Sequence, residues 1–244
     1  MILGKMKIPL PSLTTTLKSG LIACWEFDNS GTSVPDAGGV SGLALSSNGT
    51  TQQAGVVGYS NKFANTSYYA SLDNANFTSD INNLTRTFSI NAWVYFTSFS
   101  TETYHNVISS GTYASTNAWN LDSYYTGGNK YIRASFYGAA GYTQGGVVSP
   151  STGIVTYSWF MITATLDGTN IRLYKNGSLI GTSGAMQGTN ALNPTQDIYF
   201  GIKSNLTSSL TGCLDQTALW NKTLTVSEIS MLYNSGNGLA YTNW

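Results

Sequence analysis

Charged side chains are the scarcest feature of this 244-residue chain. Only 9% of its residues are Asp, Glu, Lys or Arg, against roughly 25% in an average globular protein. The 11 basic and 11 acidic residues cancel. Because nucleic-acid binders draw much of their affinity from a basic face, we expect no nucleic acid as a partner. Lys5, Lys7 and Lys18 do gather near the N-terminus, and we interpret them as part of a solvated basic arm.

Cysteine, histidine and long apolar runs are also nearly absent. Cys24 and Cys213 allow one disulfide or two buried free thiols, and we favour the thiols. The single histidine, His105, has no G-x-S-x-G serine to serve, which argues against a Ser-His-Asp triad. No run reaches the length of a membrane helix, and the first 20 residues lack the apolar core of a secretion signal. We therefore expect neither membrane contact nor an export signal.

Short strands separated by turn signals dominate what is present. The stretch "FSINAWVYF" (88–96) alternates, with Phe88 to Phe96 in steps of two on one face. Asp167-Gly168 and Asn176-Gly177 suit tight hairpin turns and predict a three-stranded meander over 158–183. One helix is expected at "TVSEISMLYN", begun by a Thr225/Glu228 capping box and stopped by Gly236. This pattern predicts an all-β, antiparallel jelly-roll β-sandwich with one short C-terminal helix.

Two segments follow from this pattern. Residues 1–19 are expected to form an extended N-terminal arm, because Pro9 and Pro11 restrict the backbone and remove hydrogen-bond donors. Residues 20–244 are expected to form a single sandwich domain. Docking on a larger assembly would use the arm through Lys5, Lys7, Pro9 and Pro11.

The order of motifs resembles a known family. "GLIACWEFD", "FSINAWVYF", "WFMITATLDGTNIRLYKNGSLIG" and "LTGCLDQTALWNKTLTVSEISMLYN" follow one another as in the laminin G-like branch of the concanavalin A-like lectin/glucanase superfamily. The tail "LYNSGNGLAY" is similar to endings of laminin G-like proteins of bacteriophage particles. This resemblance implies a non-enzymatic structural or adhesive virion protein, either a capsid decoration or a tail or fibre component.

Several expectations depend on that resemblance. The partners would be other virion proteins of the capsid or tail, further copies of the chain, and a cell-surface glycan. The protein would be made in the host cytoplasm and end in the virion. The alternative is a carbohydrate-binding, lectin-like module not tied to a particle.

Glu26 and Asp28 in "GLIACWEFDNS" raise the remote alternative of a glycoside hydrolase. On a strand, residues two apart share a face about 7 Å apart, and paired carboxylates cleave glycosidic bonds. The laminarinase-type hydrolases of the superfamily carry a second glutamate on the same strand. Here Asn29 and Ser30 follow instead, so we expect no catalytic residues.

The resemblance also points to a candidate calcium-binding loop, because laminin G-like domains often bind one ion. The family loop carries several Asp and Asn oxygens, whereas "PDAGGVSG" keeps only Asp36. Calcium needs six to eight oxygen ligands. We therefore assign no metal and no cofactor to this loop.

Tyrosine is concentrated in residues 104–142, which hold seven of the chain's sixteen. A tyrosine ring offers a flat apolar face with a hydroxyl, which suits sugar rings and protein interfaces. If a glycan site exists, the predicted residues are Trp119, Tyr124, Tyr125 and Tyr137. The favoured alternative is that alternating tyrosines simply fill the sandwich and its rims.

Overall fold

The computed structural model describes most of the chain. The described residues are 14–29, 31–38, 43–64, 67–77, 87–99, 103–111, 118–137, 145–148, 154–186 and 196–244. Lys5, Lys7, Pro9 and Pro11 of the predicted assembly arm lie outside the described residues.

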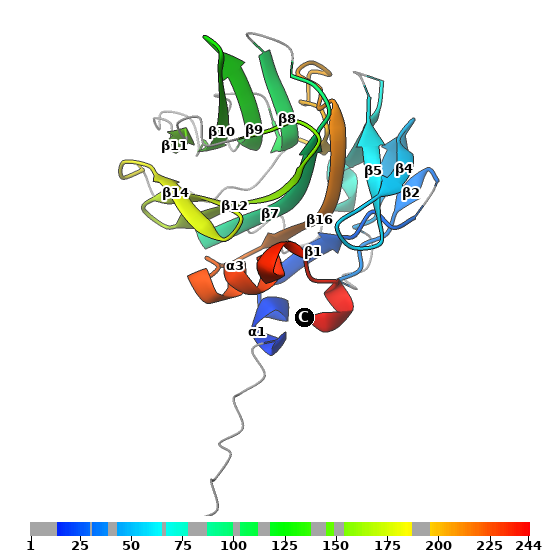
Figure 1. Ribbon diagram of the computed structural model, residues 1–244. Helices are drawn as coiled ribbons and strands as arrows, with labels where there is room; N and C mark the ends of the chain where they lie inside the picture. The colour runs from blue at the N-terminus through cyan, green and yellow to red at the C-terminus, as the bar shows by residue number, and fades with distance from the viewer. Residues whose placement is uncertain are drawn as a thin grey trace, which may run out of the picture.

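Two antiparallel sheets form the body of the molecule, stacked as two layers (Figure 1). Sheet A has the order β14-β13-β12-β7-β16-β5-β4, and β1 also pairs with β16. Its strands are β1 (Leu21–Trp25), β4 (Thr51–Ala54), β5 (Tyr59–Phe63), β7 (Thr87–Phe96), β12 (Trp159–Asp167), β13 (Ile171–Lys175), β14 (Ser178–Thr182) and β16 (Gly212–Trp220). The predicted meander is confirmed as β12, β13 and β14.

Sheet B has the order β11-β10-β9-β8-β15-β6-β3-β2. Its strands are β2 (Ser33–Val34), β3 (Leu45–Asn48), β6 (Tyr69–Leu72), β8 (Thr103–Ser110), β9 (Trp119–Thr126), β10 (Asn129–Phe136), β11 (Gly145–Val148) and β15 (Ile198–Phe200). The predicted all-β sandwich is confirmed.

The main core lies between the sheets. Phe88, Ile90 and Val94 of β7 are fully buried in it, together with Phe136 of β10 and Phe200 of β15. Alternation along β7 therefore predicted the inward face correctly. Burying this apolar surface is the main favourable term that holds the two layers together.

A second apolar cluster covers the outer face of sheet A. Helix α3 (Val226–Tyr233) lies against this face (Figure 1), where Tyr233 stacks on Trp93 with ring centroids 5.7 Å apart. Thr225 and Glu228 form the expected capping box. The helix ends at Tyr233, its C-cap Asn234 takes a left-handed φ of 46°, and a 3-10 turn then leads to Gly236.

The N-terminal part of the domain differs from expectation. Thr14–Lys18 form a short helix, α1, although an extended arm was predicted as far as residue 19. Leu17 is fully buried, and its carbonyl accepts a hydrogen bond from Trp220 Nε1 at 2.7 Å. Trp220 also stacks on Trp244, so both ends of the described chain pack on the same outer face. These apolar and hydrogen-bonding contacts stabilise the helical turn, so Thr14–Lys18 are helical and not extended as expected.

Cys24 and Cys213 are both buried free thiols. The strands that carry them, β1 and β16, are neighbours, but Cys24 lies opposite Ala218. Among the described residues, 3-10 turns span Asn74–Asn76, Asn234–Gly236 and Tyr241–Asn243. None of the helices in the described part of the chain has the length and apolar character needed to cross a lipid bilayer.

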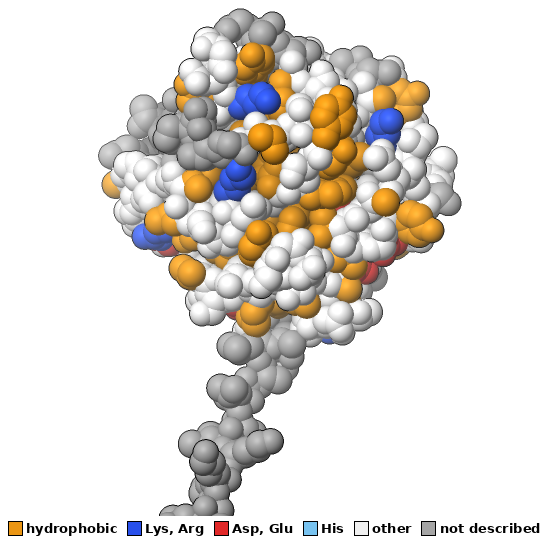
Figure 2. Space-filling model, viewed as in Figure 1, with side chains coloured by type: hydrophobic (Ala, Val, Ile, Leu, Met, Phe, Trp, Pro, Cys, Tyr) orange, Lys and Arg blue, Asp and Glu red, His pale blue; other side chains and the backbone are white. Residues whose placement is uncertain are grey.

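The surface reflects the low charge of the sequence. Figure 2 shows hydrophobic and uncharged polar side chains over most of one face, with a few separate Lys and Arg side chains and very little acidic area.

Candidate functional site

A row of three tyrosines crosses the outer face of sheet B. Tyr104 of β8 lies opposite Tyr124 of β9, which in turn lies opposite Tyr131 of β10. Side chains of directly paired residues point to the same face of a sheet. Tyr104 and Tyr124 are stacked, with centroids 4.4 Å apart and planes 22° apart. We call these three residues the tyrosine row.

The tyrosine row borders a pocket of about 240 Å³ that Thr126 and Arg133 complete. Gly127 and Gly128 form the turn between β9 and β10, and both have positive φ. This two-residue turn aligns Tyr124 with Tyr131 and Asp122 with Arg133. The hairpin therefore places aromatic rings near its tip and an ion pair nearer its base.

Arg133, which lines the pocket, belongs to a buried ion pair. Arg133 Nε donates to Asp122 Oδ1 at 3.0 Å, and its Nη2 donates to Asp122 Oδ2 at 2.5 Å. Asn120 Nδ2 donates to the same carboxylate at 2.6 Å. Burial raises the pKa of Asp122, and the positive charge of Arg133 opposes that rise. The guanidinium also lies over Tyr104, with Cζ 4.3 Å from the ring centroid, so the ion pair and the tyrosine row support each other.

Only one of the four predicted glycan residues lines this pocket. Tyr124 does so, whereas Tyr125 is the next residue along the strand, points to the opposite face and packs near Phe99. Trp119 is 0% exposed and packs against Phe88 in the main core, so its prediction as a sugar-stacking residue was wrong. Tyr137 is 4% exposed, and that burial also removes it as a binding surface.

The residues predicted from the sequence did not include Arg133, Asp122 or Lys203. Tyr104 and Tyr131 were counted in the tyrosine-rich region but were not selected. Alternation around the Gly127-Gly128 turn was the signal that could have found Tyr131 and Arg133.

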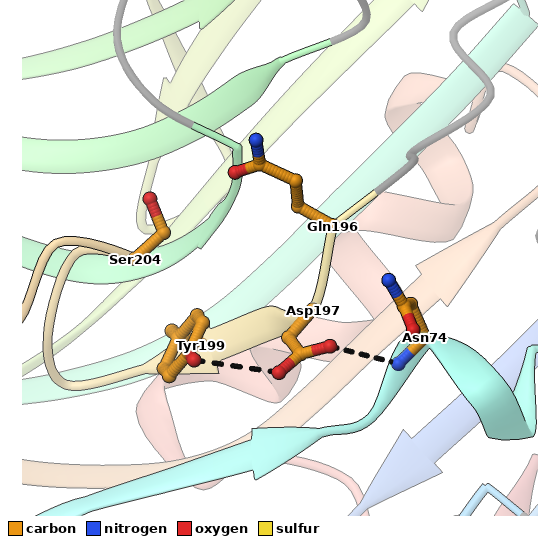
Figure 3. Close-up of a pocket in the computed structure, with 5 residues that line it drawn as sticks. All are labelled: Asn74, Gln196, Asp197, Tyr199 and Ser204. Atoms are coloured by element: carbon orange, nitrogen blue, oxygen red, sulfur yellow. Dashed lines mark hydrogen bonds between the residues drawn. The ribbon is translucent and has the colours of Figure 1, made fainter.

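A second, polar pocket of about 250 Å³ lies on sheet B, lined by Asn74, Gln196, Asp197, Tyr199 and Ser204. Figure 3 shows Asp197 between Tyr199 and Asn74, with Gln196 pointing away from them and Ser204 on a separate loop. Asp197 accepts the Asn74 backbone N–H at 2.9 Å and the Tyr199 hydroxyl at 3.3 Å. Because β15 pairs with β8, both pockets belong to the same sheet.

Glu26 and Asp28 do not share a strand face. Strand β1 ends at Trp25, and Phe27 has a φ of 59°, which breaks the alternation. Glu26 Oε1 accepts the Tyr241 backbone N–H at 2.8 Å. Asp28 Oδ1 accepts the Tyr59 N–H at 2.6 Å. Both line a pocket of about 190 Å³, but each carboxylate holds a backbone segment in place.

Two other polar residues, Asp36 and His105, have structural partners. Asp36 Oδ1 accepts the backbone N–H groups of Cys24 and Gly38, at 2.9 and 2.8 Å. His105 is 3% exposed, packs near Phe99 and has Nδ1 3.2 Å from the Ser209 carbonyl. Among the described residues, no group of three or more His, Cys, Asp or Glu side chains could hold a metal ion.

Asp215 is a fully buried carboxylate at an irregularity in β16. Its Oδ2 accepts the backbone N–H groups of Val56 and Val57, at 2.7 and 3.0 Å, and its Oδ1 accepts that of Gln216 at 2.7 Å. Burial raises the pKa of Asp215 to about 7, against the effect of these three donors.

Comparison with known proteins identifies the family. Residues 43–230 match the laminin G-type model of the concanavalin A-like lectin/glucanases superfamily, and the chain belongs to this family. None of the curated protein sequences compared with the chain matches it.

Solved structures share the fold at low sequence identity. The binding domain of Paraclostridial Mosquitocidal Protein 1 aligns with a TM-score of 0.71 and 17% identity, over 90% of this chain and 53% of that one. A second similar structure is domain 4 of AbnA, a GH43 extracellular arabinanase from Geobacillus stearothermophilus, in complex with arabinotriose. It aligns with a TM-score of 0.63 and 16% identity, over 86% of this chain and 96% of that one.

The binding domain of Botulinum Neurotoxin DC, in complex with SialylT, aligns with a TM-score of 0.67 and 17% identity over 90% and 52%. The chain thus spans about half the length of both toxin binding domains, 53% and 52%.

Proposed function

We propose that this protein is a non-enzymatic, lectin-like module that binds a glycan at the tyrosine row. The observation that carries the proposal is the alignment of Tyr104, Tyr124 and Tyr131 beside one pocket. Rings fixed by strand pairing lose little conformational freedom on binding, so their contact with a ligand is efficient.

The pocket chemistry suits a sugar. Aromatic rings pack against the apolar C–H faces of a pyranose, while tyrosine and threonine hydroxyls exchange hydrogen bonds with its hydroxyl groups. The stack covers one face of Tyr104 and one face of Tyr124, and the Arg133 guanidinium also lies over the Tyr104 ring. The rings of Tyr124 and Tyr131 are therefore assigned to the sugar, and Tyr104 is assigned to hold Tyr124 in position.

The similar structures add support through their bound molecules. Domain 4 of the arabinanase is in complex with arabinotriose, and the neurotoxin domain is in complex with SialylT. A structure of botulinum neurotoxin type C also matches, and the entry of that toxin into cells is dependent upon interaction with two ganglioside molecules. The absence of a paired acid and nucleophile at Glu26 and Asp28 favours binding over hydrolysis.

The test is a glycan array followed by titration calorimetry on the glycans that bind. Tyr124→Ala should weaken the affinity at least tenfold, because the stacking of the sugar on the aromatic ring is lost together with the tyrosine hydroxyl. The matched control is Tyr59→Ala, a 55% exposed tyrosine on sheet A, which should bind normally. No binding by the parent protein, or an equal loss in both variants, would refute the proposal.

A finer proposal concerns where the module acts. We propose that it is an adhesive component of a phage particle, on the capsid or the tail, and that it assembles as a homo-oligomer there. The tail motif "LYNSGNGLAY" and the low-charge surface favour this role. Mass spectrometry of a density-purified virion band should find the chain at high copy number, and its absence would leave a binding module without a particle.

A further inference from the structure

Lys203 brings a second positive charge to the tyrosine row. Its Nζ lies 4.1 Å from the Tyr104 ring centroid, while Arg133 Cζ lies 4.3 Å from the same centroid. Lys203 comes from the loop after β15, and this loop is held by hydrogen bonds from Lys203 N to Thr207 O and from Leu206 N to Lys203 O. Two cations from separate segments therefore meet at one ring.

The charges around that ring do not balance. Arg133 is committed to Asp122 by two hydrogen bonds. The three ion pairs among the described residues are Arg133–Asp122, Arg172–Asp167 and Lys222–Glu228, and none of them includes Lys203. One buried carboxylate therefore serves two cations, which leaves an excess positive charge beside the pocket.

Partial burial strengthens the attraction of this excess positive charge for an anion. Burial lowers the pKa of Lys203, and Asp122 is the described carboxylate whose charge opposes that effect. A half-buried ammonium gains more from an anion than an exposed one does, because solvent screening is weaker there. A ligand with a negative group would satisfy the lysine, whereas a neutral ligand would not.

We propose that the glycan recognised at the tyrosine row is acidic, with its carboxylate or sulfate group placed against Lys203. This rests on the proposed function and narrows its ligand class. Tyr124 and Tyr131 contact the sugar ring, Lys203 pairs with the anion, and Arg133 reinforces the positive potential without leaving Asp122. The pairing of one charge with stacked rings selects acidic over neutral members of the same sugar series.

The test compares matched acidic and neutral probes. The probes are 3'-sialyllactose against lactose, oligogalacturonate against its methyl ester, and a chondroitin sulfate oligosaccharide against unsulfated chondroitin. Sialyllactose and galacturonate report carboxylate recognition, and the chondroitin pair reports sulfate. In at least one pair the acidic member should bind about tenfold tighter, as expected for one charge-assisted hydrogen bond.

The variants tie that preference to the lysine. Lys203→Met keeps the apolar stem on Tyr104 and removes the charge, so it should abolish the preference while neutral binding persists. Lys203→Arg should retain it, and Lys62→Met, on β5 of sheet A, should behave like the parent. Circular dichroism and thermal unfolding of each variant establish that the fold is unchanged.

The outcomes separate the inference from the proposed function. If acidic and neutral members bind equally, or the preference survives Lys203→Met, the acidic-ligand inference is overturned and glycan binding stands. If no probe in the panel binds and the glycan array yields only neutral ligands, the acidic-ligand inference is overturned and glycan binding stands; if the array yields no ligand, both are overturned. Raising the salt concentration should weaken only the acidic probes, because only their binding includes the ion pair.

Discussion

Removal of Arg133 should destabilise the domain strongly, because it leaves a fully buried carboxylate without its counter-ion. Asp122 is 0% exposed and takes two hydrogen bonds from Arg133. Breaking a buried pair from one side costs about 3–5 kcal/mol in free energy of unfolding. Arg133→Met keeps most of the side-chain volume, so we expect a loss of that size at neutral pH.

The loss should depend on pH in a defined direction. Without Arg133, only the charge of Lys203 and the hydrogen bond from Asn120 oppose the effect of burial on Asp122, so its pKa rises further above the value in the unfolded chain. A carboxyl whose folded-state pKa is raised costs stability in its ionised form, and the cost grows as pH rises. The deficit of Arg133→Met relative to the parent should therefore be smaller at pH 5 than at pH 8.

Urea unfolding at both pH values measures these differences. The matched double variant Asp122→Asn/Arg133→Met removes the orphaned charge and should recover at least half of the lost stability. A deficit below about 1 kcal/mol for Arg133→Met would refute the reasoning, since that is the range of an exposed ion pair. A deficit that does not change with pH would refute the role given to Asp122.

Three further predictions concern other parts of the fold. Burial raises the pKa of Asp215 to about 7, so the free energy of unfolding of the parent should fall as the pH rises from about 4 to about 7, whereas that of Asp215→Asn should not. Parallel pH profiles of the two proteins would contradict this. Thr225→Ala removes the capping box of α3 and should cost about 1 kcal/mol in urea unfolding, whereas an unchanged midpoint would be inconsistent with a stabilising cap. Burial raises the pKa of the Cys24 and Cys213 thiols, so Ellman's reagent at pH 8 should label neither until the protein unfolds; rapid labelling of the folded protein would disprove their burial.

The fold was predictable because its signals are local. Alternation along β7 and the Asp167-Gly168 and Asn176-Gly177 turns are properties of short segments, and the structure confirms them. The helix at Thr14–Lys18 was not predictable in this way, because contacts with Trp220 hold it in place. A distant partner in the sequence determined that conformation.

The candidate site was only partly predictable. The tyrosine-rich region was the right one, but selecting Tyr124 and Tyr125 together ignored that neighbours on a strand face opposite ways. The Gly127-Gly128 turn could have paired Tyr124 with Tyr131 from sequence alone. The contact of Lys203 with the Tyr104 ring depends on how the loop after β15 packs beside β8, and no local sequence pattern predicts that contact.

A crystal structure of the protein with its tightest-binding array glycan tests the central claim most directly. We expect a sugar ring in van der Waals contact with Tyr124 or Tyr131, at the pocket that Arg133 completes. A glycan bound elsewhere, with no contact to the tyrosine row, would contradict the assignment of this surface as the binding site.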